Sequence, residues 1–135
     1  MSEDSAVARF TDAPHPRGRG SVAEAAGAAW LERHGYRILV RNYGPRWAEI
    51  DVVAREGDTL CFIEIKARRN EDLGSPLEAV TSQKQSQIVR AATHYLVETD
   101  WPGPCRFDVL GMTADAGGDW RFELIRDAFE VPQRA

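Results

Sequence analysis

Two carboxylates and a lysine have the types and spacing that suit metal-assisted chemistry. Asp51 is followed further along the chain by the tripeptide Glu64-Ile65-Lys66. Carboxylate oxygens are the ligands that Mg²⁺ and Mn²⁺ prefer. A lysine can donate to a metal-bound water or perturb its pKa, whereas arginine has too high a pKa to exchange a proton. The chain holds two lysines, Lys66 and Lys84, among seventeen basic residues. Because lysine is this rare in the chain, its presence two residues after Glu64 favours a chemical role slightly further.

A predicted β-hairpin brings these residues together. Residues 47–55 and 59–67 have the pattern of two strands, and the Gly-Asp pair at 57–58 suits a two-residue type II′ turn, because glycine accepts a positive φ at the first central position. The register set by such a turn places Asp51 opposite Glu64 and Glu49 opposite Lys66. It also gathers one apolar face for a core, made of Ile50, Val52, Ala54, Cys61, Ile63 and Ile65.

The opposition of the two carboxylates is the reason to expect a cation. Directly opposed residues of a hairpin have Cβ atoms about 4.5–5.5 Å apart, and like charges at that distance destabilise a sheet. Lys66 supplies one compensating charge, and Mg²⁺ or Mn²⁺ supplies two. A Glu-x-Lys sequence by itself is commonly only an exposed charge pair on a strand, so the metal-site hypothesis depends on Asp51 facing Glu64.

The remaining elements predict a mixed α/β sheet flanked by helices. Ser21 and Glu24 have the capping-box spacing at the start of the first predicted helix, and Ser75 and Glu78 have it at the start of the second. The expected element order is α-β-β-β-α-β-β. The helices are expected over residues 22–34 and 76–98, and the strands over residues 36–41, 47–55, 59–67, 106–112 and 120–126.

The composition is that of one domain, with 135 residues of which 43% are hydrophobic. We expect an N-terminal tail over residues 1–19, a single domain over residues 20–130 and a C-terminal tail over residues 131–135. No apolar run is long enough to cross a bilayer, and the acidic start of the chain lacks a secretory signal, so the expected location is cytoplasmic. Two cysteines, Cys61 and Cys105, are too few for a disulfide framework.

Charge alone does not identify a partner. The formal net charge is −4, yet residues 17–69 carry ten basic and seven acidic side chains, whereas residues 70–135 carry six and eleven. A basic patch attracts phosphate over roughly 8–10 Å at physiological salt. An ordinary solvated surface is the better explanation of so small an excess.

At these residues the chain resembles the PD-(D/E)XK nuclease superfamily, which has a restriction-endonuclease-like fold. More closely, it resembles the YraN family of small bacterial proteins of poorly defined function. The likeness covers about residues 18–129. Ala23 and Ala48 stand where that family has glycine. The motifs that carry the resemblance are Glu24, Gly35-Tyr36-Arg37-Ile38-Leu39-Val40-Arg41-Asn42, Ala48-Glu49-Ile50-Asp51 and Phe62-Ile63-Glu64-Ile65-Lys66-Ala67-Arg68.

The resemblance implies roles for individual residues. Asp51 and Glu64 would bind Mg²⁺ or Mn²⁺ with help from the Ile65 carbonyl, and Lys66 would orient or activate the attacking water. Glu24 would complete the acidic cluster from the first helix, although its place in a capping box is an equal alternative. Glu49, which the predicted register places opposite Lys66, would be a partner of that lysine.

The predicted function is metal-dependent hydrolysis of DNA phosphodiester bonds, with branched or processed DNA as a candidate substrate. The alternative is a non-catalytic module that binds nucleic acid or a partner protein. Four basic residues are candidate phosphate contacts, although exposed arginines at strand ends are as common: Arg46, Arg68, Arg69 and Lys84. A homodimer or a protein partner is compatible with both hypotheses. For Asp108 the sequence leaves two alternatives: its side chain reaches the site, or it is solvated beside a turn.

Overall fold

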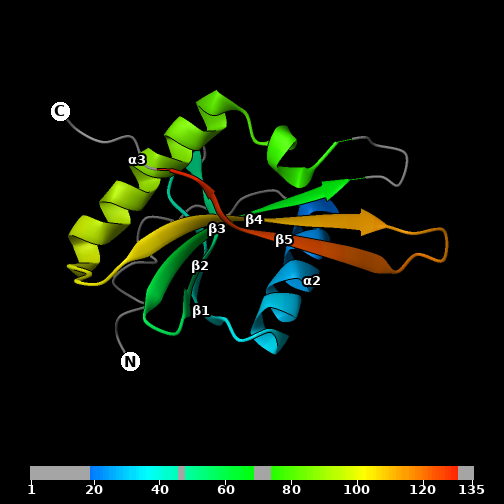
Figure 1. Cartoon of the computed structure of the whole chain (residues 1–135), viewed down its shortest axis with the longest axis horizontal. Coiled ribbons are helices and arrows are strands. Elements are labelled where there is room, and N and C mark those ends of the chain that lie inside the picture. The colour runs from blue at the N-terminus through cyan, green and yellow to red at the C-terminus, as the bar shows by residue number, and fades with distance from the viewer. Residues whose placement is uncertain (1–18, 46–47, 69–73, 131–135) are drawn as a thin grey trace.

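The chain forms a five-stranded sheet with a helix on each face (Figure 1). The computed structural model describes residues 19–45, 48–68 and 74–130. Arg46, Arg69 and nearly all of both predicted tails lie outside these residues. The elements follow the predicted order: α2 (Arg19–Arg33), β1 (Arg37–Tyr43), β2 (Ile50–Glu56), β3 (Thr59–Arg68), the 3-10 helix η3 (Pro76–Ala79), α3 (Ser82–Thr99), β4 (Cys105–Ala114) and β5 (Trp120–Phe129).

The sheet is mixed, as the sequence predicts. Its strand order is β1-β2-β3-β4-β5, and every neighbouring pair is antiparallel except β3 and β4. A parallel pair needs a crossover connection, and here η3 and α3 provide it. The crossover covers one face of the sheet, which leaves α2 to cover the other.

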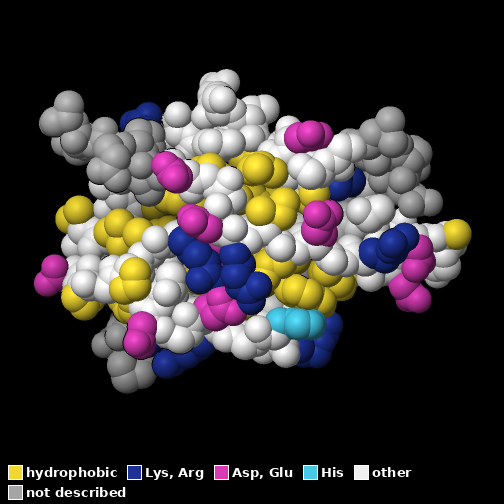
Figure 2. All heavy atoms as spheres, viewed as in Figure 1, with side chains coloured by type: hydrophobic (Ala, Val, Ile, Leu, Met, Phe, Trp, Pro, Cys, Tyr) yellow, Lys and Arg dark blue, Asp and Glu magenta, His cyan; other side chains and the backbone are white. Residues whose placement is uncertain are grey.

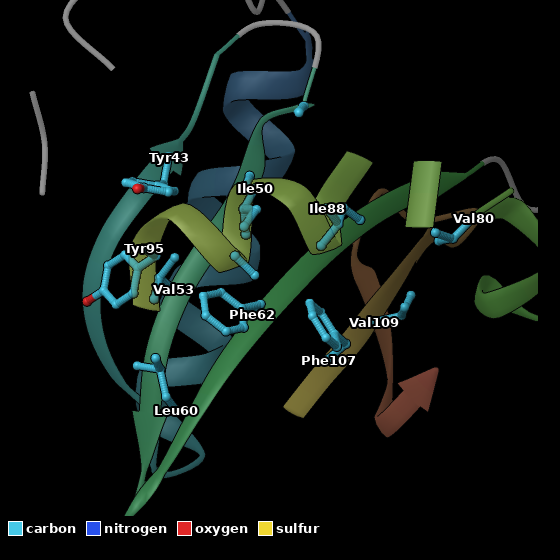
Figure 3. Close-up of a cluster of buried hydrophobic side chains, with 13 residues drawn as sticks. Tyr43, Ile50, Val53, Leu60, Phe62, Val80, Ile88, Tyr95, Phe107 and Val109 are labelled. Carbon is cyan, nitrogen blue, oxygen red and sulfur yellow. The ribbon is translucent and has the colours of Figure 1, made fainter. Parts of the chain in front are cut away.

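Each face of the sheet has its own core, a feature that the sequence analysis missed for the face bearing the acids. On the α2 side, Val52, Ile63 and Ile65 pack with Leu31 of the helix. The α3-side core contains Tyr43, Ile50, Val53, Leu60, Phe62, Val80, Ile88, Tyr95, Phe107 and Val109 (Figure 3). The acidic side chains of the central strands are therefore set in a buried surface rather than on a solvated one.

The helix starts differ from the predicted ones. The helix α2 begins at Arg19, so Ser21 lies inside it, and the prediction that Ser21 caps the helix was wrong. The capping box of Ser75 and Glu78 is confirmed, but it caps η3 and not a continuous long helix. The chain is extended at Val80 and Thr81, and the Thr81 side chain accepts a hydrogen bond from the Lys84 N–H at 3.1 Å. This second cap starts α3 and places Lys84 in its first turn.

In the described part of the chain, none of the helices is both long and apolar enough to span a membrane. The two longer ones, α2 and α3, instead each bury one side against the sheet.

The hairpin register is confirmed near the turn. Gly57 has φ 61°, and Asp58 does not have a positive φ, as a type II′ turn requires. The pairs run from Glu56 with Thr59 to Val52 with Ile63, in the predicted register.

Beyond Val52 the predicted alternation of faces fails. Ile50 packs in the α3-side core, whereas Ile65, its predicted partner, packs on the α2 side. The Asp51 side chain accepts the Ile65 N–H at 2.8 Å, so a side chain takes the place of the next ladder bond. The backbone pairing of Asp51 with Glu64 is thus replaced by a contact through side chains.

Gly111 allows the crossover to sit close to the sheet. It pairs with Lys66 of β3, and a Cβ built on it would lie 2.2 Å from Pro76 Cγ and 2.7 Å from Pro76 Cβ. Because a proline ring cannot swing away, Gly111→Val should displace η3 and lower the free energy of unfolding by about 1–3 kcal/mol. Urea denaturation measures this, with Gly117→Val in the exposed β4–β5 turn as the matched control. Equal stability of the two variants would contradict the prediction.

Candidate functional site

Asp51 and Glu64 meet on the face of the sheet that α3 covers. Both residues are only 6% exposed. Ile63 and Ile65 point to the α2 side, so Glu64 between them points to the α3 side. The Ile65 N–H holds Asp51 Oδ2 at 2.8 Å and thereby fixes the orientation of the Asp51 carboxylate.

The pKa of Glu64 shows the electrostatic consequence of this contact. Burial, above all, and then the negative charge of Asp51 raise the pKa of Glu64 to about 8, and a hydrogen bond between the two carboxyl groups acts in the same direction. Such a bond requires a proton on one of the two groups. Among the described residues, Glu64 Oε1 is buried with no hydrogen-bond partner. The pair therefore needs a proton or a cation, and it has a carboxylate oxygen available for a cation.

Both lysines of the chain act on this pair. Lys84 Nζ lies 3.9 Å from Glu64 Oε2, and its side chain is 34% exposed. The charges of Lys84 and then Lys66 oppose the rise in the Glu64 pKa. From the sequence Lys84 was predicted only as a phosphate contact, and its place beside Glu64 was not predicted. The available signal was the rarity of lysine in a chain rich in arginine.

The two further predicted acids are buried close to the same end of the sheet. Gly27 packs on the Ile65 side chain, and Glu24 lies one helical turn earlier on the same side of α2, with 6% exposure. Since α2 begins before Ser21, the capping-box alternative for Glu24 is removed. Glu49 is 7% exposed and precedes the first residue of β2, so it is not paired with Lys66 in the ladder.

Asn42 is a residue whose importance the sequence analysis did not recognise. It lies opposite Asp51, between the pairs Arg41–Val52 and Tyr43–Ile50 of β1 and β2. Its φ of 57° is left-handed, a conformation that asparagine tolerates better than most residues. Ile50 and Val52 are two residues apart and would share one face of a regular strand, yet Ile50 packs on the α3 side with Tyr43, and Val52 packs on the α2 side. The regular alternation of side chains between the two faces is therefore interrupted beside Asn42. At the same position along the strands, the Asp51 carboxylate accepts the Ile65 N–H.

The predicted phosphate contacts are only partly brought together. Lys84 joins the carboxylate pair, and Arg68 donates from Nη1 to the Gly74 carbonyl at 2.7 Å. Arg68 therefore holds the end of β3 to the segment before η3. Its side chain keeps Nε buried without a hydrogen-bond partner among the described residues.

The oxygen donors of Asp51 and Glu64 fit a hard divalent cation that keeps several of its bound waters. Within the described residues, no three or more His, Cys, Asp or Glu side chains are placed to hold a metal ion. Mg²⁺ does not require such a cage, because it is usually bound by one or two carboxylates, several waters and a substrate phosphate. Asp51 and Glu64 supply the two carboxylates. The ammonium groups of Lys84 and Lys66, whose charges act on Glu64, suit the attraction of a phosphate.

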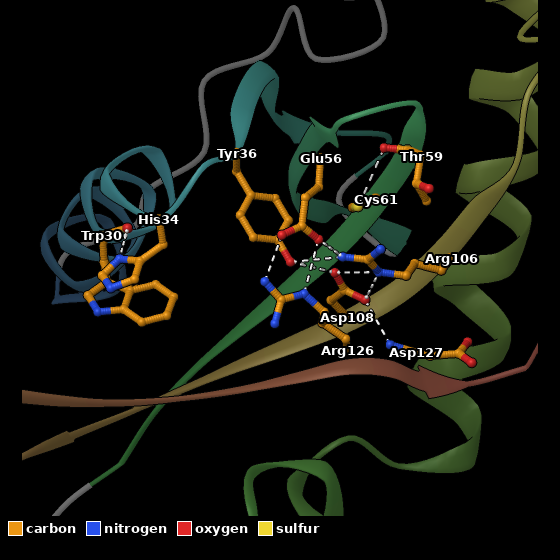
Figure 4. A network of polar contacts seen from close by, with 10 residues as sticks. All are labelled: Trp30, His34, Tyr36, Glu56, Thr59, Cys61, Arg106, Asp108, Arg126 and Asp127. Carbon is orange, nitrogen blue, oxygen red and sulfur yellow. Dashed lines mark hydrogen bonds and ion pairs between the residues drawn. The ribbon is translucent and has the colours of Figure 1, made fainter.

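A second polar network lies at the other end of the same strands (Figure 4). Asp108 is 1% exposed; it accepts hydrogen bonds from the Tyr36 hydroxyl at 3.0 Å and from Arg106 Nε at 2.9 Å. Arg106 also contacts Glu56, and Arg126 donates to Glu56 at 2.6 Å. Neither predicted alternative for Asp108 is correct, since it is neither at the acidic site nor solvated. This network joins β2, β4 and β5 and is satisfied internally.

The network predicts an acid-sensitive contribution to stability. Hydrogen bonds from Arg126, and then from Arg106, lower the pKa of Glu56 to about 2, against the effect of partial burial. The folded state holds Glu56 ionised, so this stability is present above about pH 4.5 and is lost as the pH falls toward 2. Glu56→Gln should remove about 1–2 kcal/mol at neutral pH, after allowance for solvent screening. Urea denaturation between about pH 2 and pH 7 measures it; an unchanged pH dependence would contradict the assignment.

One protein family matches most of this chain. Residues 23–112 match the model of the uncharacterised protein family UPF0102. The chain is 47% identical over 119 residues to a UPF0102 protein of Chlorobium chlorochromatii, covering 84% of this chain and 92% of that protein. It is 50% identical over 122 residues to one from Chlorobium phaeobacteroides, covering 86% and 95%, and 43% identical over 113 residues to one from Symbiobacterium thermophilum, covering 83% and 96%. The predicted likeness to the YraN-like proteins is confirmed.

Proposed function

The chain belongs to the uncharacterised protein family UPF0102, and we propose that it is a divalent-cation-dependent nuclease that hydrolyses phosphodiester bonds in DNA. The observation that carries the proposal is the buried contact between Asp51 and Glu64 beside Lys84. Lys84 Nζ lies 3.9 Å from Glu64 Oε2, and the Lys84 side chain is partly exposed, which leaves it able to contact a substrate.

Each residue of the site has a part in this hypothesis. Asp51 and Glu64 would hold the cation, and the Ile65 N–H keeps Asp51 oriented. A bound Mg²⁺ or Mn²⁺ would polarise the phosphoryl oxygen and lower the pKa of a coordinated water. Lys66 donates a hydrogen bond to the attacking water, and Lys84 attracts the phosphate to the first turn of α3, where free N–H groups favour anions.

The choice of DNA follows from the resemblance to nucleases, and branched or processed DNA is the candidate substrate. A cleavage assay tests it: the full chain is incubated with supercoiled, single-stranded and branched DNA in Mg²⁺, Mn²⁺ or EDTA. The chain offers a matched control on the same hairpin, because Asp58 is an aspartate at the exposed turn. Wild type and Asp58→Ala should cleave with either cation and not in EDTA, and Asp51→Ala should be inactive.

Two results separate this proposal from its alternatives. Equal cleavage by wild type and Asp51→Ala would identify a contaminating nuclease and would end the enzymatic hypothesis. Binding of DNA by wild type without cleavage of any substrate would identify a non-catalytic nucleic-acid-binding module on the same fold.

A further inference from the structure

The edge strand β5 carries a self-complementary pattern of charges. It is the last strand of the sheet, and among the described residues no further strand pairs with its outer edge. Arg121 and Glu123 are both exposed, two residues apart, and so project from the same face. No ion pair within the described chain joins either of them to a partner. An unpaired edge of this kind is a template for another strand.

The opposite face of β5 presents hydrophobic side chains. Trp120, Phe122 and Leu124 are partly buried and pack along the α2-side core, where Phe122 stacks on Trp30 with ring centroids 5.1 Å apart. Figure 2 views the molecule from the side of β5 and shows hydrophobic side chains exposed among charged ones over β4 and β5. A strand laid against this edge would cover apolar surface on one face and meet charges on the other.

We infer that two copies of the chain associate through their β5 strands, in antiparallel pairing about a two-fold axis at Phe122. This register places Arg121 of each copy opposite Glu123 of the other. It also brings the two Phe122 side chains together and sets each Trp120 opposite a Leu124. Opposite charges directly across a strand pair are stabilising, and aromatic pairs add to them.

Neighbouring registers are disfavoured by the same charges. A two-fold axis at Arg121 would oppose two arginines, and one at Glu123 would oppose two glutamates. Pairing cannot extend far toward the end of β5, because Asp127 has φ 56° and the β4–β5 register shifts between Phe107 and Val109. The straight part of the strand is therefore centred near Phe122.

The other edge of the sheet is not suited to pair with itself. The exposed residues of β1 are Arg37 and Arg41, and an antiparallel pairing centred on Leu39 opposes Arg37 to Arg41, while one centred on either arginine opposes it to its own copy. Its register also shifts between Ile38 and Val40. Of the two edges, β5 alone combines opposite charges with an apolar face, and a symmetric dimer closes by using it once.

Sedimentation velocity of the full chain tests the dimer, which has twice the 15.1 kDa mass of one copy. Arg121→Glu and Glu123→Arg should each raise the dissociation constant by about tenfold to a hundredfold, because each creates two like-charge pairs. The double variant, with both charges exchanged, should restore the wild-type constant. Arg37→Glu on the opposite edge is the matched control and should leave it unchanged.

Three results would overturn the inference. They are a monomeric wild type at about 100 µM, single variants that dimerise as wild type does, and a double variant that remains as weak as the singles. A dissociation constant that changes with Arg37→Glu and not with Arg121→Glu would place the interface on β1 instead. None of these readings depends on whether the chain cleaves DNA.

Discussion

Glu64→Gln is expected to lower cation-dependent DNA cleavage by about a thousandfold and to stabilise the cation-free protein at pH 8. Both effects have the same cause. Glu64 is 6% exposed, and burial together with the charge of Asp51 raises its pKa to about 8. A neutral amide of the same shape removes the repulsion and can still donate to Asp51, so the free energy of unfolding should rise by about 1–3 kcal/mol. The same amide is a poor ligand for Mg²⁺.

Opposite changes in activity and stability distinguish a functional carboxylate from a structural one. Urea denaturation in EDTA and the cleavage rate in Mg²⁺ measure the two effects. Glu32→Gln, on the exposed side of α2, is the matched control and should change neither. A Glu64→Gln protein that is both inactive and clearly less stable would show that Glu64 holds the fold together, and the interpretation of the pair as a cation site would be wrong.

The stability of the cation-free protein is expected to fall as the pH rises from about 4.5 to about 8, and Mg²⁺ is expected to reverse the fall. In this range folded Glu64 keeps its proton, because its pKa is raised to about 8, whereas the unfolded chain loses it. The folded state binds more protons, so its stability decreases with rising pH. A cation that replaces the proton stabilises only the folded state.

Thermal unfolding with EDTA or Mg²⁺ at about pH 5.5 and about pH 8 measures this coupling. The increase in Tm on adding Mg²⁺ should be several degrees larger at the higher pH. Glu64→Gln should lose both the pH dependence in this range and the response to Mg²⁺. An equal response to Mg²⁺ at both pH values would show that the cation binds elsewhere.

The sequence predicted the hairpin because its signals are local. A glycine at the first turn position fixes the register near Gly57, and the alternation of apolar residues agrees with it. The same locality explains why the capping box at Ser75 was found. The element order and the mixed sheet follow from the spacing of these segments.

The predictions from sequence failed at positions where tertiary contacts determine the orientation or the partner of a side chain. Ile50 changes face because Asn42 across the strand pair adopts a left-handed φ and because Asp51 bonds to the Ile65 N–H. Neither event has a signature in the pattern of apolar residues. Lys84 reaches Glu64 only because Thr81 starts a new helix above β3, which single-residue propensities do not reveal. The Asp108 network joins segments far apart in the sequence, so it too could not be read from spacing.

Isothermal titration calorimetry of Mn²⁺ binding to the DNA-free protein at pH 8 tests directly whether Asp51 and Glu64 hold a cation. We expect one Mn²⁺ bound per chain, with proton release on binding, and loss of that binding in both Asp51→Asn and Glu64→Gln but not in Asp58→Asn. Unchanged Mn²⁺ binding by Asp51→Asn and Glu64→Gln would contradict this expectation.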